Sequence, residues 1–132
     1  MAASRDNYDG VPYELLPRDS AEVTPVSAEH LRTRRERKES EHEFNIEPEW
    51  AVEAALDPAA LLGDGGSTSR ESVLVIGRST SAPPLQYGEV GRVLAVYVIP
   101  ATHPPDGRWF VVTAWTAGRR QWSAYWKEHP DG

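Results

Sequence analysis

Apolar and polar residues alternate most clearly between residues 107 and 115. This segment divides into two faces, with Trp109, Val111, Thr113 and Trp115 on one and Phe110, Val112 and Ala114 on the other. A two-residue period of aromatic and β-branched side chains is typical of a strand that is buried on at least one face. The segment therefore predicts a β-strand of the core.

The period lengthens beyond Thr116, a residue that can cap the start of a helix. Aromatic residues then recur at helical spacing: Trp122, Tyr125 and Trp126. The pattern predicts a helix that follows the strand directly. At about 100° per residue, Arg119 lies at the edge of the aromatic face and Arg120 lies on the opposite side.

Two further strands are predicted before this one, at residues 71–79 and 91–99. Residues 91–99 are apolar on both faces, which suits a central strand. The turns at residues 80–90 and 100–106 are too short to contain crossover helices. The three strands are therefore expected to pair as an antiparallel meander.

Upstream, residues 43–46 predict a short strand, and Pro48 suits the first turn of a helix. Asp57-Pro58 predicts a break with a possible second short helix, and residues 63–69 predict a flexible loop. The expected fold is an α+β domain over residues 43–129, in the order strand, helix, possible second helix, three strands, helix. Its sheet is a meander of three to four strands with helices on one face.

Residues 1–42 are expected to form an N-terminal extension. The first 26 residues hold regularly spaced prolines and no periodicity, so they are expected to be irregular. Their small apolar cluster is expected to collapse locally within a mobile tail, and docking on the domain or on a partner is the alternative. A polar helix is predicted from Ser27 to residue 43, with Leu31 as its one large apolar residue. Glutamates interleave with the basic residues at 32–38, which favours a solvated helix over an RNA contact.

The length of 132 residues and the apolar fraction of 39% suit one domain with a tail. The sequence contains no cysteine, which excludes disulfides and thiolate metal sites. Short apolar runs and an N-terminus unlike a signal peptide predict no membrane association and a cytoplasmic location.

The net charge of −6 argues against a general nucleic-acid binder, yet residues 70–127 hold seven bases and three acids. These bases are either solvated charges at strand ends or a site that faces a polyanion.

Candidate chemistry centres on arginine, whose guanidinium group binds phosphate through paired donors. In the predicted meander, Arg78 and Arg92 share one edge of the sheet, and Arg119 approaches the same end. These three residues predict a phosphate site, with strand capping as the alternative interpretation. The histidines lack metal-type pairing and no phosphate-binding glycine loop is present, so no metal and no cofactor are expected.

Further RNA contacts are candidates at Arg108, Arg120 and Tyr97. The ring of Tyr97 and those of the tryptophans could stack on bases of single-stranded RNA, although an aromatic stripe is more often part of the core. Tyr125 has a hydroxyl that could donate a proton, or it is a packed residue whose hydroxyl is satisfied.

Several segments share a pattern with a known family. Residues 75–79 end a strand with glycine, arginine and serine, and residues 91–98 form the next strand. Residues 113–125 run from a strand end through Arg119-Arg120 to Tyr125, and Asp57-Pro58 ends the first helical region. Over roughly residues 43–126, the chain resembles the BrnT family of toxins from bacterial type II toxin–antitoxin pairs. The resemblance implies a RelE-like ribonuclease fold.

The resemblance also implies a metal-independent endoribonuclease that a cognate antitoxin protein inhibits. Arg78, Arg92 and Arg119 would neutralise the scissile phosphate, and Tyr125 would transfer a proton. The chain departs from the family in three ways: it lacks the lysine and histidine of the first helix, it has an apparent insertion at residues 80–90, and Trp115 replaces an arginine. The general base would then be one of three carboxylates: Glu49, Glu53 or Glu71. The alternative is a catalytically inactive RelE-like module that acts in protein–protein interaction.

Overall fold

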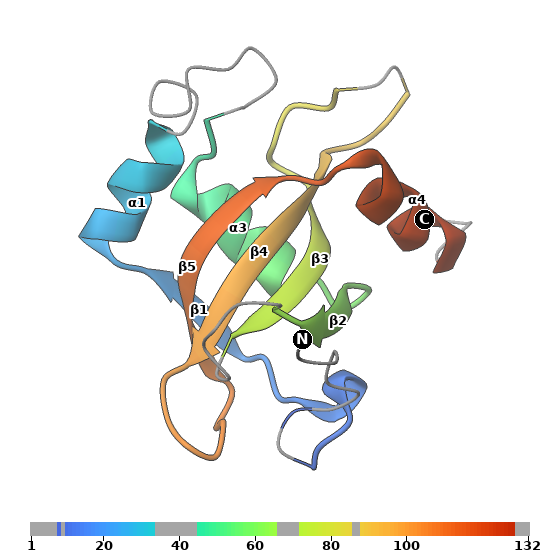
Figure 1. Ribbon diagram of the computed structural model, residues 1–132. Coiled ribbons are helices and arrows are strands. Elements are labelled where there is room, and N and C mark those ends of the chain that lie inside the picture. The colour runs from blue at the N-terminus through green and yellow to red at the C-terminus, as the bar shows by residue number, and fades with distance from the viewer. Residues whose placement is uncertain (1–7, 9, 34–44, 66–71, 86–87, 129–132) are drawn as a thin grey trace, which may run out of the picture.

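Five strands form one mixed sheet in the computed structural model of the protein (Figure 1). The structure describes residues 8, 10–33, 45–65, 72–85 and 88–128. In chain order the elements are η1 (Tyr13–Leu15), β1 (Ser20–Val23), α1 (Pro25–Arg32), α3 (Pro48–Ala55), β2 (Leu61–Asp64), β3 (Val73–Ser79), β4 (Arg92–Pro100), β5 (Arg108–Thr116) and α4 (Arg119–Glu128). The predicted α+β class is confirmed.

The antiparallel meander of β3, β4 and β5 is also confirmed, with β4 in the middle. The complete strand order is β1-β5-β4-β3-β2, because β2 pairs with β3 and β1 pairs with β5. The β1–β5 pair is parallel. The expectation of a three- to four-stranded, purely antiparallel sheet is therefore wrong in strand number and in the direction of one edge strand.

Strand β1 lies in the segment that the sequence predicts to be irregular. The strand is too short to show a period of its own, and it forms because β5 offers a free edge. The N–H groups of Asp19 and Ser20 both donate to the carbonyl oxygen of Gly107, at 2.7 and 3.0 Å. Gly107 has a φ of +105°, and a Cβ at this position would collide with the carboxylate of Asp19. The residues that determine β1 thus lie far along the chain.

Helix α1 begins at Pro25, two residues before the predicted start. Thr24 is the N-cap, and its hydroxyl oxygen accepts a hydrogen bond from the N–H of Ser27 at 3.3 Å. Leu31 is only 1% exposed, so this helix is docked on the core and is not polar on every side. The remainder of the predicted helix, residues 34–43, lies outside the described residues.

The short strand predicted at residues 43–46 is not present in its described part. Residues 45 and 46 have no strand pairing, and residues 43 and 44 lie outside the described residues. The N–H of Ile46 donates to the carbonyl of Leu31, and the Ile46 side chain is fully buried. Ile46 therefore anchors the chain between α1 and α3 as a core residue.

Helix α3 begins at Pro48, as predicted, but the possible second helix after Asp57 is wrong. Residues 61–64 form β2 there, with Leu61 opposite Ile76. The end of α3 lies directly on β3 at Gly77, where a Cβ would collide with the carbonyl oxygen of Ala54. A glycine at this position permits the close approach of helix and strand.

Helices lie on both faces of the sheet, so the prediction of helices on one face is wrong. Helices α1 and α3 cover the first face, over a core that includes Ile46, Ala54, Val75, Leu94, Val96 and Val111. Helix α4 lies on the second face, where Tyr125 packs with Ile76, Val93 and Ala95. Strands β3 and β4 supply apolar residues to both faces, and each face therefore needs its own cover.

A β-bulge in β5 also changes the predicted faces of that strand. Tyr97 lies opposite Thr113, but Val98 lies opposite Val111, so Val112 has no partner of its own. Trp109 and Val111 consequently share the first face with Ala114, while Trp115 packs on the second face. The extra residue breaks the two-residue period that the sequence suggests.

Candidate nucleic-acid interface

Helix α4 crosses one end of the second face (Figure 1). Its start is held beside β4, because the N–H of Ala117 donates to the carbonyl of Val93 at 3.0 Å. Gln121 caps this start by accepting a hydrogen bond from the N–H of Gly118 at 3.0 Å. The last turn lies over β3, where the Arg78 guanidinium is 5.4 Å from the ring centroid of Trp126. The helix thus runs from the β5 side of the sheet to the β3 side.

Beyond α4, the second face carries partly exposed side chains. These are Leu74, Tyr97, Ile99, Phe110, Thr113 and Trp115. In the part of the chain that the structure describes, no helix covers them (Figure 1). The second face is therefore covered by α4 at one end, and we call the remainder, which no described helix covers, the open face.

Arg78 and Arg92 share one end of the sheet, as predicted, but they lie on opposite faces. Arg92 pairs with Ser79 in the register, and Arg78 pairs with Val93. Neighbouring positions along a strand point to opposite faces. The Arg78 side chain accordingly lies under α4, whereas the Arg92 guanidinium stacks over the ring of Trp50 in α3, 5.5 Å from its centroid. One phosphate cannot contact both.

Arg92 is a structural residue in this arrangement. It is 7% exposed, and its Nε donates to the carbonyl of Pro83 at 3.0 Å. Burial lowers the pKa of Arg92, and the nearby Glu89 carboxylate opposes that shift. A small pocket beside it is lined by Leu85, Glu89, Val93, Thr116 and Trp122, among others, and the acid in this lining disfavours an anion. Arg92 therefore holds Pro83, in the β3–β4 connection, against the end of the sheet.

Arg119 and Arg120 form the exposed first turn of α4. Arg119 lies at the same end of the sheet as Arg78, as predicted, but at the opposite end of the helix. The separation of seven residues between Arg119 and Trp126 corresponds to about 10 Å of helix axis. Arg78 and Arg119 therefore do not surround a single phosphate.

Tyr125 is buried and its hydroxyl is engaged. It is 2% exposed, and the hydroxyl donates to Oδ2 of Asp57 at 2.7 Å. Burial first, and then this hydrogen bond and the negative charge of Asp57, raise the pKa of Tyr125 well above its ordinary value. A phenol with a raised pKa is a weaker acid, which argues against Tyr125 as the proton donor.

Asp57 reaches Tyr125 around an edge of the sheet. Strand β2 stops pairing with β3 at Ile76, and beyond that point the N–H of Arg78 donates to Oδ2 of Asp57 at 2.8 Å. Oδ1 of Asp57 accepts from the N–H of Ala59 at 2.9 Å. The sequence signalled Asp57 only as the end of a helix, since its bonding partners come from β3 and α4.

Like Asp57, Arg18 makes polar contacts that the sequence did not indicate. Its guanidinium donates to the carbonyls of Ala55 and Asp57, at 2.7 and 3.0 Å. It thereby satisfies carbonyl groups at the C-terminus of α3, where a cation also favours the helix dipole. Burial lowers the pKa of Arg18, and the Asp57 carboxylate opposes this. The N-terminal segment, α3 and α4 are linked through these contacts.

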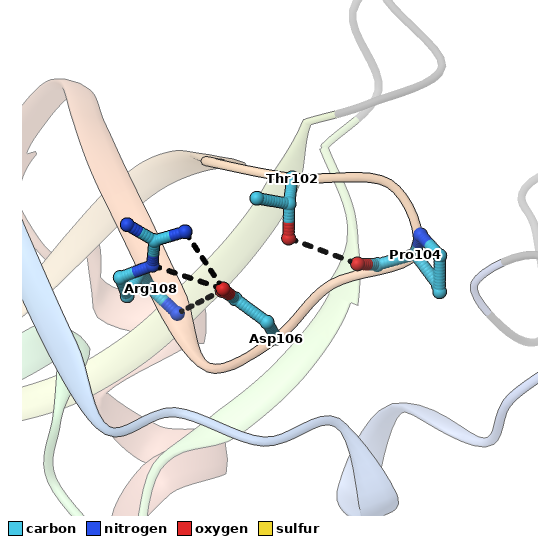
Figure 2. Close-up of polar contacts among 4 residues, drawn as sticks. All are labelled: Thr102, Pro104, Asp106 and Arg108. Atoms are coloured by element: carbon cyan, nitrogen blue, oxygen red, sulfur yellow. Dashed lines mark hydrogen bonds and ion pairs between the residues drawn. The ribbon is translucent and has the colours of Figure 1, made fainter.

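Arg108 lies at the other end of the sheet and is paired with Asp106 in the β4–β5 turn (Figure 2). Its Nε and Nη2 are 2.9 and 2.8 Å from Oδ2 of Asp106, and its N–H donates to Oδ1 at 3.0 Å. In the same turn, the Thr102 hydroxyl donates to the carbonyl of Pro104. The acid offsets much of the charge that Arg108 would offer to RNA.

Tyr97 lies on the open face and contacts Trp115. Their ring centroids are 5.0 Å apart, and the ring planes are inclined by 60°. Both side chains are partly exposed. Trp109 differs from them, because it is 2% exposed and its Nε1 donates to the carbonyl of Pro17. Tyr97 and Trp115 are therefore surface aromatics, and Trp109 belongs to the core.

Of the three carboxylates considered as general bases, the structure describes Glu49 and Glu53, both on α3. Glu53 accepts from the hydroxyls of Ser79 and Ser81, at 2.6 and 2.7 Å, and from the N–H of Ser81. Burial alone would raise the pKa of Glu53, but these hydrogen bonds outweigh it and the net pKa is lowered. Glu49 is exposed on α3, which covers the first face, and Glu71 lies outside the described residues.

Comparison of the chain with protein-family models, with curated proteins and with solved structures finds no significant match. Within the described residues, no helix is long and apolar enough to cross a membrane. No group of three or more histidine, aspartate or glutamate side chains in that part of the chain could hold a metal ion.

Proposed function

We propose that this chain binds RNA at the α4 end of its sheet and acts as a toxin-like, metal-independent endoribonuclease of a toxin–antitoxin pair. The observation that carries the proposal is the clustering of cations at this end. Arg78 lies under the last turn of α4, and Arg119, Arg120 and Lys127 are exposed along the helix. Guanidinium groups spaced along a helix suit successive phosphates of one RNA chain.

A RelE-like fold is part of the same proposal. The order of elements supports it: a strand, two helices, a run of antiparallel strands and a closing helix, with one more strand than expected. The resemblance of residues 75–79, 91–98 and 113–125 to BrnT toxins supports the toxin class and a cognate antitoxin as partner. In this arrangement the first candidates for phosphate contact are Arg78 and Arg119, with Arg120 beside them.

The second candidate function is a catalytically inactive module that binds a protein partner. One observation favours it: two of the described groups considered for proton transfer are already engaged. Tyr125 donates to Asp57, and Glu53 accepts hydrogen bonds from two serines. Cleavage in the absence of metal would then need another base, such as Glu49 or Glu71, to remove the proton from the attacking 2′-hydroxyl of the RNA.

The deciding experiment measures RNA cleavage by the purified chain with EDTA present, together with growth after induced expression. We expect cleavage and growth arrest from the wild type, and a loss of cleavage of at least about tenfold in Arg119→Ala together with loss of the growth arrest, since one phosphate contact to a charged donor contributes about 1.5–3 kcal/mol. Arg32→Ala is the matched control, because Arg32 is an exposed arginine on α1, on the other side of the sheet.

Intact RNA and unharmed cells, with RNA binding retained, would instead support the inactive module. Equal activity of Arg119→Ala and wild type would remove the α4 end of the sheet as the phosphate-binding site.

A further inference from the structure

The open face carries two aromatic side chains that contact each other and lie near α4, the helix with exposed cations. Tyr97 on β4 and Trp115 on β5 lie diagonally across the strand pair, with Ala95 opposite Trp115 and Thr113 opposite Tyr97. Their rings are in contact, and both remain partly exposed. We call Tyr97 and Trp115 the aromatic pair.

Contacts within the protein cover only part of the two side chains of the aromatic pair. Trp115 packs against the small cluster beneath α4, which contains Ile76, Val93 and Ala95. Tyr97 lies one row further from α4, beside Leu74 on β3. The neighbouring Thr113 and Leu74 are also partly exposed, and Leu74 packs against the same small cluster as Trp115.

Charge indicates what kind of ligand suits this surface. Four basic residues lie on or beside α4 at this end of the sheet, namely Arg78, Arg119, Arg120 and Lys127, although the whole chain has a net charge of −6. The exposed arginines at positions 119 and 120 immediately follow the strand that carries Trp115. An aromatic surface beside a row of cations suits a ligand that has both flat apolar rings and negative charges.

Building on the proposed RNA binding, we infer that the aromatic pair stacks on unpaired bases, so that the substrate is single-stranded RNA. Every base has a π-face, and stacking on aromatic rings therefore tolerates different sequences. In duplex RNA these faces are covered by neighbouring base pairs, and side chains cannot reach them. The phosphates of the same strand then extend along α4 toward Arg119 and Arg120.

Three probes of equal length separate stacking from charge: a labelled single-stranded RNA of eight nucleotides, the matching duplex, and an abasic oligonucleotide with the same phosphates. Fluorescence anisotropy at low salt gives the affinity for each. We expect wild type to bind the single strand roughly tenfold or more tightly than the abasic probe and the duplex, which is the scale of one base stacked on one ring.

Trp115→Leu should remove most of this difference, while Trp115→Phe should keep much of it, since phenylalanine retains a stacking ring. Tyr97→Leu gives a second, independent variant in case Trp115→Leu fails to fold. Val112→Ala is the control, because Val112 is a 44% exposed apolar residue on the same strand and should leave all three affinities unchanged.

Equal binding of the abasic and single-stranded probes would overturn stacking, and so would unchanged affinity in both leucine variants. If that binding still depends on Arg119, the proposed RNA function stands without the aromatic pair. Failure of the wild type to bind any of the three probes would overturn both proposals and leave the open face to a protein partner.

Discussion

At the scale of single residues, two carboxylates at the end of α3 collect hydrogen bonds from distant segments. Glu53 accepts from Ser79 and Ser81, and Asp57 accepts from Arg78 and Tyr125. Each carboxylate accepts hydrogen bonds from N–H and hydroxyl groups at a place where strand pairing has ended, so that these donors are satisfied.

The pH dependence of stability tests the role of Glu53. Its pKa is lower in the folded chain than in the unfolded chain, so its contribution is complete above the unfolded pKa and is lost as the pH falls through the folded pKa. Glu53→Gln should therefore cost on the order of 1 kcal/mol near neutral pH, a value discounted for solvent screening. The difference in urea midpoint from wild type should shrink below about pH 4.

Glu49→Gln provides the matched control for this measurement, since Glu49 is an exposed glutamate on the same helix. Its urea midpoint should follow that of the wild type across the pH range. A difference for Glu53→Gln that stays constant down to pH 3 would contradict a charged Glu53 as the acceptor.

At the scale of elements, the N-terminal segment is integrated into the main core. Tyr8, Tyr13 and Leu16 are 4%, 7% and 6% exposed, and the ring of Tyr8 contacts Trp109 edge to face. Strand β1 covers the edge of β5 that would otherwise be free to pair with another chain. The segment before α1 therefore both fills the core and protects the sheet.

Adjacent leucines in this segment offer a test. Leu16→Ala should destabilise the protein by about 2–4 kcal/mol, because it removes a buried side chain and leaves a cavity. Leu15→Ala should change stability by less than about 0.5 kcal/mol, because Leu15 is 68% exposed. Urea denaturation followed by circular dichroism measures both. Equal and small effects would mean that the segment around η1 contributes little to the core.

At the scale of the whole molecule, charge is separated. The net charge is −6, but the strands of the meander and α4 are basic. A phosphate chain is therefore repelled by the molecule at long range and attracted by one end at short range. Salt screens exposed charges over roughly 10 Å at 0.1 M, so both contributions are sensitive to ionic strength.

The salt dependence of single-stranded RNA binding tests how many phosphates this end contacts. Removing two contacts by the double change Arg119→Ala and Arg120→Ala should reduce the slope of log K against log salt by about 1.4. Affinities measured at several salt concentrations give the slope. Arg32→Ala should leave it unchanged, and a double variant with the wild-type slope would place the phosphate contacts elsewhere.

Local patterns predicted the parts of the fold whose residues interact with near neighbours. The meander of β3 to β5, the start of α3 at Pro48 and the helix at the end of the chain follow from periodicity, proline position and short turns. The strands β1 and β2 were missed, because four residues are too few to show a period and their pairing depends on β5 and β3. The bulge at Val112 was missed because it depends on how β5 pairs with β4.

The candidate site was likewise predicted only in part. The sequence placed Arg78, Arg92 and Arg119 at one end of the sheet, and strand order alone was enough for that. It did not assign the two strand arginines to opposite faces of the sheet, and it had no signal for Asp57 as the partner of Tyr125.

By itself, the sequence determined the α+β class, the central meander and the end of the sheet at which arginines gather, because alternation, helical spacing and turn length are properties of neighbouring residues. Tertiary structure alone decided which face each arginine occupies, which strands close the edges and which side chains stay open to a ligand. These outcomes depend on one residue of register and on contacts between segments far apart in the chain, and both arise only when the chain packs.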